Sequence, residues 1–216
     1  MLTTWPWQHW ARLRPEQPAL HGESEPYNWR QLAAELDRRA AGYQAQGVLE
    51  GSGVALRGKN SLALLLDYLA LIQCGARVLV LNPQLPAALL AQLLPGLTLA
   101  FLREHAAPVT TPVPPLYPPR HAPAPCHVAP VAFAPSRLAT LTLTSGSSGL
   151  PKAAAHSLAA HLASAAGVLA RIPFPADACW LLSLPLFHVS GQGIVWRWLR
   201  AGAALAVRPQ WPLADA

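Results

Sequence analysis

The sequence contains little charge. Only 12% of its 216 residues are Asp, Glu, Lys or Arg, whereas 52% are hydrophobic, so most of the chain is expected to fold around a sizeable core. The formal net charge of +6 is spread among arginines and includes no run of basic residues. This distribution does not indicate a nucleic-acid-binding face, and the positive balance favours small anionic ligands instead.

Cysteines and long apolar stretches are also scarce. The three cysteines are odd in number and far apart, so they lack the spacing of zinc ligands and argue against a disulfide framework. This usage suits the reducing cytoplasm. The most apolar run, 62–72, has about eleven residues and is too short to cross a bilayer. Because the N-terminal residues also lack the basic and apolar regions of a signal peptide, we expect a cytoplasmic protein without a membrane span.

Proline, by contrast, occurs 23 times and is most crowded within residues 103–137. Proline has no N–H to donate and interrupts helices, so this segment is expected to be extended or disordered. As a Pro/Ala-rich linker or insertion, it separates a first α/β lobe, 1–102, from an incomplete second lobe, 138–216. A proline-motif ligand for a recognition module is the alternative, but such segments more often serve as spacers.

Helical and strand patterns alternate in both lobes. The strand pattern 77–81 is a continuous apolar run, which is typical of strands buried on both faces. Expected helices cover 5–14, 28–46, 61–74, 87–94, 158–171 and 193–199, with Asn28 as the N-cap of the second and Asn60 or Ser61 as the N-cap of the third. Expected strands cover 19–21, 26–27, 53–57, 77–81, 97–102, 138–143, 179–183 and 203–207. This alternation predicts an α/β fold with mainly parallel, helix-covered sheets.

One stretch places glycines, hydroxyls and a lysine between two ordered elements. Residues 144–152 have the sequence Thr-Ser-Gly-Ser-Ser-Gly-Leu-Pro-Lys and follow the strand pattern 138–143. The glycines let successive backbone N–H groups turn inward around an anion, while the hydroxyls and the ammonium group of Lys152 add donors and charge. The pattern predicts a loop that binds phosphate groups. Its candidate residues are Thr144, Ser145, Gly146, Ser147, Ser148, Gly149 and Lys152.

Three alternative roles for this stretch fit its residues less well. A flexible Ser/Gly linker rarely ends in Pro-Lys or has apolar segments on both sides. A P-loop needs Gly before its lysine and Ser or Thr after it, but Pro151 and Ala153 occupy those positions. A Ser-x-x-Lys acyl-enzyme motif is excluded because Gly149 stands three residues before Lys152.

A second block, 184–191, has the sequence Leu-Pro-Leu-Phe-His-Val-Ser-Gly and follows the strand pattern 179–183. Ligand sites in open α/β sheets form at the carboxyl ends of strands, so this block is well placed to meet a ligand. A lone histidine in such a position is usually structural, but the neighbouring proline and glycines favour a functional role for His188. Two other histidines, His156 and His161, are five residues apart, which does not suit two zinc ligands on one helix face.

Together the two blocks resemble motifs of the adenylate-forming superfamily, which includes acyl-CoA synthetases, luciferases and peptide-synthetase adenylation domains. The usual loop has Thr where Ser148 stands, and the change keeps the hydroxyl. Further stretches resemble one family of that superfamily, the o-succinylbenzoate–CoA ligases of menaquinone biosynthesis in their γ-proteobacterial form. These stretches are 5–10, 73–78, 82–86 and 181–199. The resemblance covers nearly the whole chain except 103–137.

The resemblance implies a two-step reaction. A carboxylate attacks ATP to give an acyl-adenylate and pyrophosphate, and the thiol of coenzyme A then displaces AMP. Magnesium accompanies the phosphates, and the acid would be o-succinylbenzoate. Lys152 would neutralise the β- and γ-phosphates, and His188, as the catalytic residue, would guide the carboxylate. The residues implied at the acid site are Phe187, His188, Ser190, Gly191 and Gln192, although Gly191 could simply serve packing.

The resemblance extends only to the first half of the family's large domain. The adenine loop with its magnesium-binding glutamate, the ribose-binding aspartate, the hinge and the small C-terminal domain have no counterpart in the sequence. We therefore expect a partial N-terminal domain that is inactive alone, with the C-terminal half or a second copy as possible protein partners. Two alternatives stay open, namely a synthetase for another acid and a non-catalytic remnant that binds phosphate or a partner.

Overall fold

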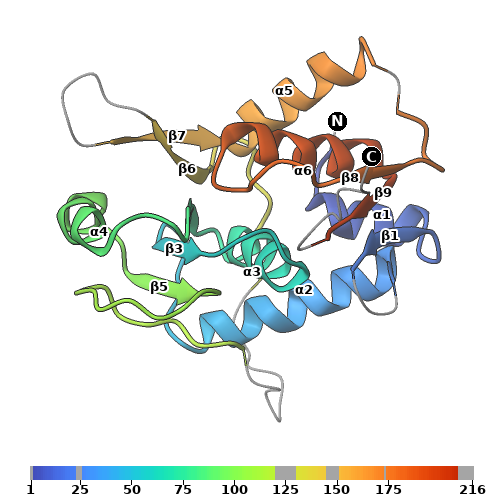
Figure 1. Cartoon of the computed structure of the whole chain (residues 1–216). Coiled ribbons are helices and arrows are strands. Elements are labelled where there is room, and N and C mark those ends of the chain that lie inside the picture. Colours follow the sequence, from blue (N-terminus) through green and yellow to red (C-terminus); the bar gives the residue numbers. More distant parts are fainter. Residues whose placement is uncertain (1, 23–25, 120–129, 145–150, 173, 209–216) are drawn as a thin grey trace.

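The computed structural model describes residues 2–22, 26–119, 130–144, 151–172 and 174–208, and it contains two β-sheets with helices packed against them (Figure 1). The larger sheet has five strands in the order β5-β3-β4-β6-β7, and all neighbours are parallel except β6 and β7. Its strands are β3 (Gly53–Arg57), β4 (Arg77–Leu81), β5 (Phe101–Glu104), β6 (Leu138–Thr144) and β7 (Lys152–Ser157).

The smaller sheet joins strands from distant parts of the chain, in the order β2-β1-β9-β8. Strand β1 is antiparallel to β2 and parallel to β9, which is also parallel to β8. Its strands are β1 (Pro18–His21), β2 (Tyr27–Asn28), β8 (Cys179–Leu181) and β9 (Ala204–Ala206). The predicted α/β class with mainly parallel, helix-covered sheets is confirmed.

Six α-helices and one 3-10 helix lie in the described part of the chain, and none of them is long and apolar enough to cross a membrane. Asn28 and Gln31 form a capping box at the start of α2, with each side chain accepting a bond from the other residue's backbone N–H. Ser61 and Ser157 cap α3 and α5. The helices are α1 (Pro6–Leu13), α2 (Trp29–Gln44), α3 (Leu62–Gln73), α4 (Ala87–Leu93), η1 (Leu94–Leu97), α5 (Leu158–Leu169) and α6 (Val189–Ala201).

The central strands β3 and β4 of the five-stranded sheet are buried on both faces. Val54 of β3 and Val78 of β4 belong to a large cluster with α3 and α6, whereas Ala55 and Leu79 belong to a smaller cluster with α4. Successive residues of a strand point to opposite faces, so a sheet covered on both sides needs apolar residues at every position. This explains why β3 and β4 are continuous apolar runs in the sequence.

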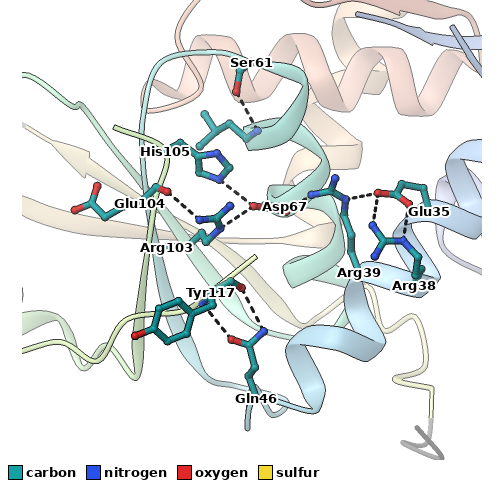
Figure 2. A network of polar contacts seen from close by, with 11 residues as sticks. Glu35, Arg38, Arg39, Gln46, Ser61, Asp67, Arg103, Glu104, His105 and Tyr117 are labelled. Carbon is teal, nitrogen blue, oxygen red and sulfur yellow. Dashed lines mark hydrogen bonds and ion pairs between the residues drawn. The ribbon is translucent and has the colours of Figure 1, made fainter. Parts of the chain in front are cut away.

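A buried carboxylate joins α2, α3 and β5 (Figure 2). Asp67 of α3 is 0% exposed and lies 2.5 Å from Arg39, 3.1 Å from Arg103 and 2.9 Å from His105. Glu35 also bonds Arg39, at 2.6 Å. Burial by itself would raise the pKa of Asp67, but the hydrogen bond with His105 and the charge of Arg39 hold that pKa below its usual value. The network therefore fixes an ionised carboxylate inside the core.

Part of the proline-rich segment runs along β5 in extended form. Leu102 donates its N–H to the Pro114 carbonyl at 2.8 Å, and Leu116 donates to the Leu102 carbonyl at 2.8 Å. The Gln46 side chain bonds both the backbone N–H and the carbonyl of Tyr117 (Figure 2). An extended backbone is therefore confirmed for this stretch. Because proline has no N–H, the stretch also blunts the edge of the sheet.

Three local predictions were wrong. Residues 153–157, for which no strand was predicted, belong to strand β7, because pairing with β6 satisfies their backbone groups, and His156 lies on this strand. Helix α6 begins at Val189, four residues before the predicted start. The strand predicted at 97–102 begins only at Phe101, because η1 precedes it and Thr98 then turns the backbone with a φ of 48°.

The division into lobes stays a prediction. Strand β5 runs to Glu104, past the expected boundary at residue 102, and each sheet combines strands from 1–102 with strands from 138–216. The two ranges therefore do not correspond to separate sheets. Residues 120–129 of the proline-rich segment lie outside the described residues.

Candidate active site

The loop that follows β8 borders a cavity of about 530 Å³. The cavity lies at the carboxyl ends of strands from both sheets, with Lys59 after β3, Asn82 after β4 and Arg208 after β9. Leu182 and Phe187 contribute apolar walls. Such a crevice is where open α/β sheets bind ligands. Apolar walls beside two cationic side chains suit an organic anion.

The second sequence block forms this loop and the first turn of α6. His188 is the N-cap residue of α6, and its side chain is exposed and makes no capping bond. Ser190 is also exposed, one residue into the helix. The first N–H groups of a helix carry partial positive charge and favour an anion. The exposed first turn of α6 thus offers hydrogen-bond donors from its backbone N–H groups and from the side chains of His188 and Ser190.

Gly191 and Gln192 occupy buried positions in the same turn. A Cβ atom at Gly191 would collide with the carbonyl groups of Pro185 and Leu184, so this glycine is required for the loop to pack on the helix. Gln192 is 0% exposed and donates from Nε2 to Leu186 O and Thr142 Oγ1. Both residues are buried, and their place at the acid site stays a prediction.

The predicted phosphate loop joins the antiparallel strands β6 and β7. Thr144 and Lys152 form the last pair of this ladder, and Thr144 Oγ1 donates to the Lys152 carbonyl at 3.2 Å. The side chains of both residues are exposed. The other candidates of this loop, Ser145, Gly146, Ser147, Ser148 and Gly149, lie outside the described residues. The ladder therefore places the two ends of the loop side by side, with Lys152 at one of them.

The two histidines near this hairpin do not form a metal site. His161 bonds Thr140 at 2.7 Å and stacks on Trp196, which makes it a core residue. His156 lies against it, with ring centroids 5.5 Å apart. No group of three or more His, Cys, Asp or Glu residues converges anywhere in the described part of the chain.

Sequence reasoning missed two polar residues of this region. Asn60, in the loop after β3, lines the cavity and bonds the backbone of the loop after β8. Arg197 lies on α6 with its guanidinium carbon 5.7 Å from the centroid of the Trp180 ring, and its Nε is buried without a hydrogen-bond partner among the described residues. The only sequence signal for Arg197 is its position between Trp196 and Trp198, which are both buried.

The fold and the two motifs together are those of the adenylate-forming class of proteins. Residues 7–216 match the AMP-binding enzyme family, and the chain belongs to this family.

Particular relatives agree with the resemblance noted in the sequence. The chain is 53% identical to 2-succinylbenzoate--CoA ligase of Escherichia coli over 99% of its own length, and 52% identical to that of Salmonella typhimurium over 98%. A structure of E. coli MenE with bound OSB-AMS superimposes with a TM-score of 0.92 at 51% identity. MenE from Bacillus subtilis, at 22% identity and a TM-score of 0.84, has the same fold. The resemblance to o-succinylbenzoate–CoA ligases is thus confirmed.

The chain spans about half the length of these relatives. The aligned region is 47% of the E. coli ligase and 46% of the S. typhimurium ligase.

Proposed function

We propose that this chain is the ATP-phosphate-binding and acid-binding half of an AMP-forming o-succinylbenzoate–CoA ligase. The observation that carries the proposal is the placement of Phe187 and His188 between a cavity and the exposed start of α6, in a chain 53% identical to a 2-succinylbenzoate--CoA ligase. The complete reaction also requires the second half that the relatives have and this chain does not cover. We propose the complete reaction only for a protein that contains both halves.

In the first step, a carboxylate oxygen of o-succinylbenzoate attacks the α-phosphorus of ATP and pyrophosphate leaves. Lys152 and the hydroxyls that begin with Thr144 hold the β- and γ-phosphates. His188 directs the carboxylate toward phosphorus, and the positive end of α6 stabilises the negative charge on the transferred group. Positioning of this kind supplies much of the rate of phosphoryl-type displacements.

In the second step, the sulfur of coenzyme A attacks the acyl carbon, the bond to AMP breaks, and the thiol proton is lost. The cavity beside Phe187 is the candidate entrance for this co-substrate. Magnesium accompanies ATP in the family, but the described residues offer no cluster of acidic or histidine ligands for it. Magnesium beside ATP is usually held by the phosphates and one or two carboxylates, and neither step above assigns a residue of this chain to it.

Arg197 is the candidate partner of the second carboxylate of o-succinylbenzoate. The acid carries two carboxylates, and only one of them is activated. Arg197 lies on the same helix as Ser190, makes no ion pair with a described acidic residue, and rests on the Trp180 ring. A planar guanidinium with free donors is suited to hold a carboxylate through two parallel hydrogen bonds.

Titration calorimetry of the 216-residue chain with ATP, AMP and OSB-AMS tests the binding roles. We expect OSB-AMS to bind to the chain. We expect Lys152→Ala to weaken the affinity for ATP at least about tenfold and to change the affinity for AMP little, because in the proposal the lysine contacts only the β- and γ-phosphates. Ser164→Ala, on an exposed face of α5, serves as a control. Equal losses for ATP and AMP, or no binding of OSB-AMS, would contradict the proposal.

Acid specificity requires the complete reaction. We expect thioester formation when the chain is supplied with the second half of the E. coli ligase, with o-succinylbenzoate preferred over other aryl and acyl acids. Preference for another acid would favour a synthetase for that acid. If Lys152→Ala changes association with a partner and no turnover is seen, the chain is a non-catalytic binding remnant.

A further inference from the structure

The backbone of Leu186 is held from two sides by side-chain amides. Its N–H donates to Asn60 Oδ1 at 2.9 Å, and its carbonyl accepts from Gln192 Nε2 at 3.2 Å. Asn60 belongs to the loop after β3, and Gln192 belongs to α6. The residue held in this way immediately precedes Phe187 and His188. Two elements that are far apart in the sequence therefore determine where these candidates lie.

The Asn60 amide makes two further bonds to the same loop. Its Nδ2 donates to the Leu184 carbonyl at 2.8 Å and to the Leu182 carbonyl at 3.4 Å. An amide can donate on one side and accept on the other, which neither a carboxylate nor an aliphatic side chain can do. The Asn60 side chain thus bonds the backbone of alternate loop residues, as a neighbouring strand would do. This gives a specific reason for asparagine at this position.

The Gln192 amide connects the same loop to the strand that leads into the phosphate loop. Its Nε2 also donates to Thr142 Oγ1 at 3.1 Å, and Thr142 lies two residues before Thr144. Gln192 is fully buried, and its Oε1 has no hydrogen-bond partner among the described residues. A buried amide with an unsatisfied oxygen costs stability, so packing alone does not account for it.

We propose that Asn60 and Gln192 are positioning residues that fix Phe187 and His188 relative to strand β6, and that neither contacts the acid. This replaces the prediction that Gln192 binds the acid directly. The inference rests on the proposed function for its meaning in catalysis. Its structural content, that two amides jointly hold the loop at Leu186, can be tested independently of that function.

The first test follows amide exchange and ring signals by NMR on the labelled 216-residue chain. Asn60→Ala removes every bond of that side chain to the loop, and Gln192→Leu removes the bonds to Leu186 and Thr142. We expect Asn60→Ala to speed exchange of the Leu186 amide at least about tenfold while the β4 amides change little. Both variants should shift the ring signals of Phe187 and His188.

Ser61→Ala provides the matched control. It removes the cap of α3 next to Asn60 and destabilises the same element without touching the loop. We expect it to leave the ring signals of Phe187 and His188 unchanged. If it shifts them as much as Asn60→Ala does, or if neither amide variant shifts them, the positioning role is wrong.

The second test measures binding of OSB-AMS. We expect each amide variant to weaken OSB-AMS binding about tenfold or more and to weaken ATP binding less, because neither amide bonds Thr144 or Lys152. Asn60→Asp should behave like Asn60→Ala, since its second oxygen would face two carbonyls. Shifted ring signals with unchanged OSB-AMS affinity would overturn the positioning role. If the unmodified chain does not bind OSB-AMS, the proposed function falls, and the ring signals alone decide whether the two amides position the loop.

Discussion

His161 stacks face to face on Trp196, with ring centroids 4.9 Å apart and planes 8° from parallel. His161 comes from α5 and Trp196 from α6, so the pair holds these two helices together beside β6. The imidazole also bonds the Thr140 hydroxyl at 2.7 Å. Burial, and to a lesser degree the charge of His156, lowers the pKa of His161 to about 3. The folded protein therefore contains this histidine in its neutral form.

Acid should destabilise the fold through His161. Its pKa is about 6.5 in an unfolded chain and about 3 in the folded one, so between these values only the unfolded chain binds the proton. Stability from this group is complete above pH 6.5 and declines as the pH falls. From pH 7.5 to 5.5 the expected contribution is a loss of about 1.4 kcal/mol in the free energy of unfolding. Urea denaturation at the two pH values measures it.

His161→Gln removes this titration while keeping an amide that can bond Thr140. We expect the variant to be less stable at pH 7.5, because the stacking is lost, but to lose less stability on acidification than the unmodified chain. His21→Gln, at a half-exposed position of β1, controls for removal of a histidine elsewhere. An unchanged acid dependence in His161→Gln would show that His161 is not the group responsible.

Gly191 should not tolerate a side chain. Gly191→Ala would drive its Cβ into the carbonyls of Pro185 and Leu184, and we expect a loss of about 1–3 kcal/mol or more in the free energy of unfolding. Gly167→Ala is the matched control, because a Cβ at that position of α5 meets nothing within 4 Å. This control should gain about 0.5–1 kcal/mol. Equal effects of the two substitutions would refute the close contact at Gly191.

Removal of the buried carboxylate should be costly. Asp67→Asn leaves Arg103 without its counter-ion and Arg39 with Glu35 alone, and breaking a buried pair in this way costs about 3–5 kcal/mol. Glu50→Gln breaks an ion pair with Arg137 in which the glutamate is 60% exposed, and we expect less than about 1 kcal/mol. Thermal or urea denaturation compares the two variants. Similar losses would show that burial does not strengthen the Asp67 network.

Much of the fold could be predicted from local pattern. Strands β3 and β4 were predicted with their observed ends because apolar runs buried on both faces have a clear sequence signal. Asn28 marked a helix start correctly, and of the two candidates Asn60 and Ser61 it is Ser61 that caps α3. Strand β7 was missed because its alanine-rich sequence has low strand propensity, and only pairing with β6 makes it a strand.

The candidate site was less predictable than the fold. Motif resemblance identified Lys152 and His188, but their roles stay predictions. Asn60 had no motif to mark it, because its function depends on a loop more than 120 residues away in the sequence. The burial of Gln192 likewise follows from how α6 packs against β6, which no local pattern reports. Residues that act through long-range contacts become visible only in the assembled structure.

Arg197 allows the acid-binding proposal to be tested apart from nucleotide binding. Arg197→Gln keeps a planar polar group but removes the charge, so the second carboxylate of o-succinylbenzoate would lose its counter-ion. Hydrogen bonds to charged groups are worth about 1.5–3 kcal/mol, so we expect OSB-AMS affinity to fall by a factor of about 10–150 while AMP affinity stays the same. Arg200→Gln, an exposed position in the last turn of the same helix, should change neither affinity. If Arg197→Gln weakens AMP and OSB-AMS equally, the guanidinium supports the fold of the site and does not recognise the acid.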